Sequence, residues 1–150
     1  MSTEGFDALA RRVGPLFDRV EAAGLSSLTG PERVLFSVWG AGGQIENGGF
    51  DQFFYNSSGD YAAEALDGFR AIGAVGKAVV IEQAFALFPG SALPRDRDER
   101  IGALNALIAK AGEDVFQRLD EAFYAIPEDV DALLAAYVQA HNDEIATEPG

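Results

Sequence analysis

The stretch IENGGFDQFFYNSSGD, residues 45–60, combines two adjacent glycines with four aromatic residues and a short polar run. Gly48 and Gly49 can adopt a positive φ without strain, so they can end a helix. If Gly49 is the left-handed residue, Ile45 and Phe50 occupy the positions that make the hydrophobic contact of a Schellman cap. The stretch therefore predicts a helix stop followed by a tight turn.

The aromatic residues that follow the turn share one helical face. Phe50, Phe53 and Phe54 have the spacing i, i+3, i+4, which predicts a short helix that inserts an aromatic plug into the core. Buried backbone groups in such a turn need hydrogen-bond partners. The polar side chains expected to supply them are Asn47, Gln52 and Asn56.

The rest of the chain has helical periodicity and lacks the alternating pattern of strands. With 150 residues, of which 48% are apolar, it predicts a single compact all-α domain of seven to eight helices over residues 1–150. The expected helices span residues 6–13, 16–24, 29–47, 60–72, 75–88, 98–111, 113–125 and 127 onward. A frayed tail is expected from about residue 143 to residue 150.

Local signals set several of these boundaries. Thr29 and Glu32 have the spacing of a capping box, with Pro31 in the first turn. The Gly14-Pro15 pair predicts a break or a kink. Gly73 is expected to be the glycine that ends the helix over residues 60–72.

The chain is strongly acidic, with 24 carboxylates against 11 basic residues and a net charge of −13. This balance argues against direct binding of nucleic acid, because phosphate contacts need lysine and arginine. It favours a basic partner, because the negative electrostatic field of the protein would attract positive charge. There is no cysteine, no run of about 20 apolar residues and no signal-peptide pattern, so a cytoplasmic protein without a membrane contact is expected.

The carboxylates are clustered. Asp60, Glu64 and Asp67 fall within about 60° of one another if residues 60–72 are helical. From residue 111 onward there are ten acids and one base. Acids one helical turn apart lie roughly 5–6 Å from each other, close to the spacing of successive phosphates on one DNA strand. The candidate partner-binding residues are Asp60, Glu64, Asp67, Glu113, Asp114, Asp120, Glu121, Glu128, Asp129 and Asp131, with the acids of the helix over 113–125 facing away from its apolar residues.

Motifs for catalysis or cofactor binding are missing from the sequence. The glycines complete neither a phosphate-binding loop nor a dinucleotide fingerprint, and the residues after Asp96 do not fit a calcium loop. The single histidine, His141, continues an apolar stripe and is interpreted as neither a metal ligand nor a catalytic base. No catalytic residue, metal or cofactor is therefore predicted, and the protein is expected not to be an enzyme.

Two other interpretations fit the sequence. One is a small-molecule- or metal-binding enzyme with a cleft near Glu46, Asn47 and Asn56. The other is a plain oligomeric domain of a larger complex.

The opening stretch also resembles the signature of a bacterial DNA-mimic protein family. The resemblance rests on Glu46, Asn47, Gly48, Gly49, Phe50, Gln52, Phe53, Phe54, Asn56 and Gly59, and a weaker motif matches Ile72-Gly73-Ala74. It implies an all-helical acidic domain, a homodimer, that mimics DNA and binds a transcription factor, without catalysis or cofactor. Arg95, Arg97 and Arg100 are expected to interrupt its acidic face.

Overall fold

The computed structural model describes residues 3–146, and every regular element in this range is helical. The seven α-helices are α1 (Thr3–Ala23), α2 (Gly30–Tyr55), α3 (Ala62–Ala71), α4 (Val75–Phe85), α5 (Arg97–Ala111), α6 (Gln117–Ala125) and α7 (Val130–Ala140). Short 3-10 turns lie at Leu25–Ser27, Ser57–Tyr61, Pro89–Ser91 and Asn142–Glu144. The predicted all-α class is confirmed.

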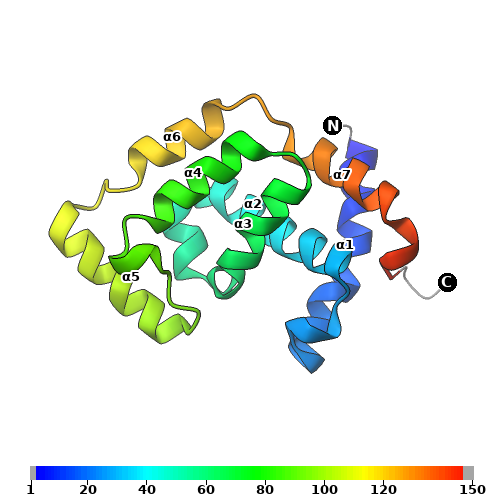
Figure 1. The fold of residues 1–150 in the computed structure, drawn as a ribbon, viewed down its shortest axis with the longest axis horizontal. Helices are drawn as coiled ribbons and strands as arrows, with labels where there is room; N and C mark the ends of the chain where they lie inside the picture. The colour runs from blue at the N-terminus through cyan, green and yellow to red at the C-terminus, as the bar shows by residue number, and fades with distance from the viewer. Residues whose placement is uncertain (1–2, 147–150) are drawn as a thin grey trace.

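Helix α2 is the central element of the fold. It contacts α1, α3, α5, α6 and α7. In Figure 1, α1 and α7 lie together at one end of the molecule, and α5 lies at the other end. Because α2 is covered from several sides, it buries residues in every turn, including Leu35, Val38, Ile45 and Phe54.

The core is centred on Phe54, which is fully buried. Its ring lies 5.1 Å from Phe53, 5.6 Å from Phe88 and 5.6 Å from Phe116, measured between centroids. Phe50 joins the same cluster, 5.7 Å from Phe54. Aromatic pairs at these separations add to the stabilisation from burial. The prediction that this segment forms an aromatic plug is confirmed.

The predicted break at Gly14-Pro15 is wrong, because α1 runs through both residues. Proline inside a helix removes one hydrogen bond and costs about 3 kcal/mol. Four residues at helical spacing compensate by burying one face of α1: Leu9, Val13, Leu16 and Val20. Each such burial contributes about 1.5–3 kcal/mol, so packing outweighs the local cost.

Three predicted helices begin later than the sequence indicated. Asp60 lies in a 3-10 turn and α3 begins at Ala62, while α6 begins at Gln117 rather than at residue 113. Helix α7 begins at Val130, because Asp129 is its N-cap and accepts a hydrogen bond from the Ala132 amide. Acidic residues are favourable both at the N-cap and in the first turn of a helix, so the sequence pattern alone does not distinguish these two positions.

The predicted glycine cap after α3 is confirmed. Gly73 has φ 90°, and the Ala74 amide donates to the Phe69 carbonyl at 2.9 Å. The Gly73 amide donates to the Arg70 carbonyl at 3.1 Å. These two bonds are those of a Schellman motif.

The capping box at the start of α2 is also confirmed, and it does more than begin the helix. The buried Glu32 carboxylate accepts from the Thr29 amide, from the Arg19 guanidinium and from the Ala146 amide. Burial alone would raise the pKa of Glu32, but these bonds hold it below the ordinary value of 4.5.

The last described residues are held by hydrogen bonds near the same capping box. Ile145 is buried and its carbonyl accepts from Arg12, while the Glu144 carbonyl accepts from Thr29. The expected fraying is therefore wrong for residues 143–146, because contacts far away in sequence hold them. The rest of that predicted tail, residues 147–150, lies outside the described residues.

Replacing Glu32 by glutamine should make this anchor independent of pH. The native state keeps the carboxylate ionised to lower pH than the unfolded chain does, so its stabilisation is present above pH 4.5 and lost as the pH falls through the lowered pKa. At pH 7, Glu32→Gln should lower the free energy of unfolding by about 1–3 kcal/mol.

Urea denaturation at pH 7 and pH 3 checks this prediction, with the exposed Glu113→Gln as the control variant. The difference between wild type and Glu32→Gln should shrink at pH 3. An equal difference at both pH values would contradict it.

Candidate functional site

The site is organised by an interruption of α2 at Gly49, where φ is 75° and ψ is −170°. This region of backbone space is essentially restricted to glycine. The Phe50 amide donates to Asp120 Oδ1 at 2.9 Å, and the Tyr124 hydroxyl donates to the Ile45 carbonyl at 2.6 Å. These are the amide and the carbonyl that a Schellman cap would join, so the predicted cap is wrong: two side chains one turn apart on α6 take its place.

The backbone at Gly49 leaves no room for a side chain. A Cβ atom built on Gly49 would lie 2.5 Å from Asp120 Oδ2. Asp120 therefore faces the interruption of α2, and the prediction that it faces away from the core is wrong. Burial raises the pKa of Asp120, the bond from Phe50 opposes this, and Asp51 and Glu121 raise the pKa further.

The side-chain amides of Asn47, Gln52 and Asn56 form a network with Gln44, whereas the prediction had them bond the backbone, so that prediction is wrong. The Asn47 amide donates to Gln52 at 3.3 Å, and Gln52 donates to Gln44 at 2.8 Å. Asn56 donates to the same Gln44 oxygen at 2.8 Å. Gln44 did not stand out in the sequence, because a partner three turns away leaves no local pattern.

Arg100 closes the other end of the stretch and is fully buried. Its guanidinium donates to the carbonyls of Phe54 and Asn56 and pairs with Asp60 at 2.9 Å. A Cβ atom on Gly59 would lie 2.5 Å from Arg100 Nε, so the signature glycine makes room for this side chain. The prediction that Arg100 interrupts the acidic surface is wrong, because it does not reach the surface.

The row formed by Asp60, Glu64 and Asp67 is compensated by the chain's own arginines. Asp60 pairs with Arg100, as described, and Glu64 pairs with Arg95 at 2.8 Å. Asp67 lies 3.6 Å from Arg70. Arg70 also pairs with Glu82, so Asp60 and Glu64 are compensated more fully than the exposed Asp67.

The candidate carboxylates after residue 111 have three kinds of environment. Three of them bond helix termini: Asp120 at the interruption of α2, Asp129 at α7, and Glu128, which accepts from the Gly76 and Lys77 amides at the start of α4. Glu113, Asp114 and Glu121 are exposed. Asp131 is half-buried and lines a cavity with Glu46.

Several of these carboxylates influence one another across helix boundaries. Burial raises the pKa of Glu46, and Asp131 raises it further. Burial and then Asp129 raise the pKa of Asp131. Tyr124 connects this group to the interruption of α2, since burial, Asp120 and Glu46 raise its pKa in turn.

We call these two neighbouring groups of carboxylates, both of which act on Tyr124, the acidic band. It consists of Glu46, Asp51, Asp120, Glu121, Asp129 and Asp131, of which Glu46 and Asp51 were not predicted to bind a partner.

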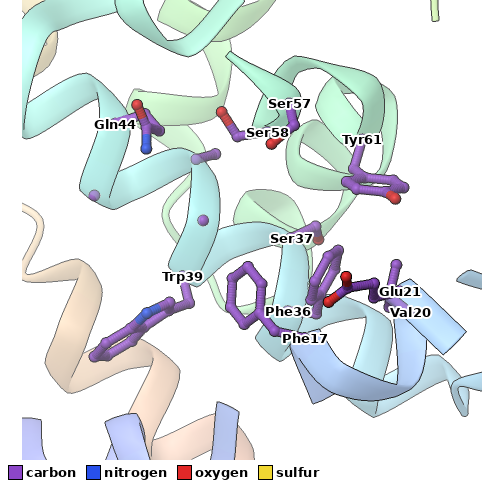
Figure 2. Close-up of a pocket in the computed structure, with 13 residues that line it drawn as sticks. Phe17, Val20, Glu21, Phe36, Ser37, Trp39, Gln44, Ser57, Ser58 and Tyr61 are labelled. Carbon is purple, nitrogen blue, oxygen red and sulfur yellow. The ribbon is translucent and has the colours of Figure 1, made fainter. Parts of the chain in front are cut away.

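A separate hollow lies between α1, α2 and the turn at Ser57–Tyr61, with a volume of about 480 Å³. Figure 2 shows the rings of Phe17, Phe36 and Trp39 near one end and Gln44 with Ser58 near the other. We call it the aromatic groove. Neither Asn47 nor Asn56 lines it, and Glu46 lines a different cavity, so neither of these two cavities is lined by all three residues of the predicted enzyme cleft.

Two further properties of the described residues bear on function. Within residues 3–146, no group of three or more side chains is arranged to hold a metal ion, and His141 stacks on Tyr137 with ring centroids 4.3 Å apart. Over the same residues, no helix has both the length and the apolar character needed to cross a membrane.

The fold and the site define an acidic all-α domain that is built around an aromatic core and an interrupted central helix. The family model of the DMP19-like proteins matches residues 26–141, so the chain belongs to the DMP19-like protein family. This match covers the whole signature stretch and six of the seven helices. Neither the curated proteins nor the solved structures contain a match.

Two glycines of α2 provide a matched test of the site. Gly49→Ala should lower the free energy of unfolding by at least about 2 kcal/mol, because alanine disfavours this backbone and its Cβ would collide with Asp120. Gly43→Ala should raise it by about 0.5–1 kcal/mol, because Gly43 is helical and a Cβ there meets nothing within 4 Å. Urea denaturation of both variants measures the two changes. Equal effects at the two positions would contradict the account.

Proposed function

We propose that this protein is a DNA mimic whose acidic band occupies the DNA-binding surface of a basic protein such as a transcription factor. The observation that carries the proposal is the mutual effect of carboxylates on α2, α6 and α7. Burial is the largest cause of the raised pKa values of Asp120, Glu46 and Asp131, and neighbouring carboxylates raise each of them further. Such a surface is relieved by a partner that brings positive charge.

The contrast with α3 supports the choice of surface. The carboxylates of Asp60, Glu64 and Asp67 already pair with arginines, so a basic partner would have to displace those arginines. In the acidic band, no arginine among residues 3–146 forms an ion pair with Asp51 or Glu121. Asp51 and Glu121 therefore offer charge to a partner at a smaller cost.

The family assignment supports the same function. The chain belongs to the DMP19-like family, and its signature stretch resembles that of a DNA-mimic family. Mimicry needs carboxylates placed like phosphates, and the band spreads them over three helices. Since DNA-binding proteins carry clustered lysine and arginine, they are the partner class that this surface fits.

The proposal predicts that DNA and salt release the partner. Immobilised protein should capture a basic DNA-binding protein from a cell lysate at low salt, and duplex DNA should displace it. Affinity should fall by on the order of tenfold or more between 0.1 M and 0.3 M salt, because exposed charge pairs are screened over about 10 Å at 0.1 M.

Matched variants locate the surface. Asp51→Asn with Glu121→Gln removes two charges from the acidic band, whereas Asp18→Asn with Asp98→Asn removes two exposed charges from α1 and α5. Only the band variant should lose the partner. A partner that is retained at both salt concentrations and is indifferent to DNA, or one that both variants lose equally, would contradict mimicry by the band.

A further inference from the structure

One end of the acidic band opens into a second cavity, between α1, α2 and α7, with a volume of about 300 Å³. Its walls include Phe6, Trp39, Gly42, Glu46, Asp131 and Leu134. We call it the Trp39 cavity. The volume falls at the lower end of the range of small-ligand pockets.

The apolar wall of the Trp39 cavity is aromatic. The rings of Phe6 and Trp39 lie 4.9 Å apart with an interplanar angle of 35°, and Phe6 is 45% exposed. On the α2 side the wall is bare backbone: Cβ atoms built on Gly42 and Gly43 would meet nothing within 4 Å. Packing within the chain therefore does not require glycine at these positions, and their missing side chains keep the cavity open.

The polar wall of the Trp39 cavity carries two carboxylates from different helices, Glu46 of α2 and Asp131 of α7. No lysine or arginine among residues 3–146 forms an ion pair with either one. Lys77 also acts on Glu46, but its ammonium lies 4.3 Å from the centre of the Phe123 ring, and Lys77 does not line the cavity.

Burial raises the pKa of both carboxylates, and each has a carboxylate neighbour that adds to the shift. A cation placed between them would relieve this repulsion.

We propose that the Trp39 cavity receives one arginine side chain of the basic partner. A guanidinium is planar, so it can stack on an aromatic ring while its N–H groups reach carboxylates on both sides. A lysine ammonium is more strongly hydrated and lacks the planar fork, so it fits these walls less well. This inference rests on the proposed function, and it names the partner group that enters the band.

Trp39 is the only tryptophan of the chain, so its fluorescence reports on the cavity directly. The probe is N-acetyl-arginine amide, with N-acetyl-lysine amide as the matched cation, titrated at constant ionic strength. The arginine compound should give a saturable change with a dissociation constant on the order of millimolar, and the lysine compound should bind at least several-fold more weakly.

Two variants separate the Trp39 cavity from the aromatic groove, which Trp39 also lines. Glu46→Gln with Asp131→Asn should weaken arginine binding at least about tenfold, equivalent to about 1.4 kcal/mol. Glu21→Gln changes the only charged residue among those of residues 3–146 that line the aromatic groove, and it should leave binding unchanged. Circular dichroism melting confirms that each variant is folded.

Three results would overturn the inference: no saturable change with the arginine compound, equal affinity for the lysine compound, or loss of binding in Glu21→Gln rather than in the double variant. The proposed function fails by a different result, since it depends on release of a captured partner by duplex DNA. If duplex DNA releases the captured partner but the arginine compound does not bind, the proposed mimicry stands and the Trp39 cavity has no part in it.

Discussion

The fold depends on how the interruption of α2 is held. At Gly49 the central helix stops and restarts, which leaves two backbone groups without a partner within the helix. Two side chains of α6 bond them: Asp120 accepts a hydrogen bond from the Phe50 amide, and Tyr124 donates one to the Ile45 carbonyl. Buried backbone groups without partners would each cost about 1–3 kcal/mol. The bonds therefore fix α6 against α2 and direct Phe50 and Phe54 into the core.

Arg100 holds the end of the same segment by bonding carbonyls that the end of α2 leaves open. Burying a guanidinium is costly unless its donors are bonded. Here the carbonyls of Phe54, Asn56 and Arg95 and the carboxylate of Asp60 accept from it. The interrupted helix is thus fixed by a carboxylate at one end and an arginine at the other.

Local signals were enough to predict part of this structure. The capping box at Thr29, the Schellman motif at Gly73 and the aromatic face of Phe50, Phe53 and Phe54 all depend on residues within a few positions of each other. The partners of the Gly49 turn could not be predicted in the same way, because Asp120 and Tyr124 lie about 70 residues downstream. The continuous α1 has the same explanation, since tertiary burial outweighs the local effect of Pro15.

The candidate site was predicted less well, because the sequence does not distinguish a carboxylate that bonds a helix terminus from one that is free. Glu128 and Asp129 bond helix starts, and Asp60 is paired with an arginine that the sequence placed on the surface. Glu46 was assigned to the structural signature, but it lies in the acidic band. The fold thus divides the carboxylates into those that bond helix termini or arginines and those, such as Asp51 and Glu121, that are exposed.

Native-state hydrogen exchange at the Phe50 amide shows whether Asp120 holds the interruption of α2. If Asp120 holds the interruption of α2, this amide should exchange only through global unfolding, as core amides do. In Asp120→Ala its protection should fall at least about tenfold more than that of other core amides. Fast exchange of the Phe50 amide in the wild-type protein, or equal protection in the variant, would contradict the account.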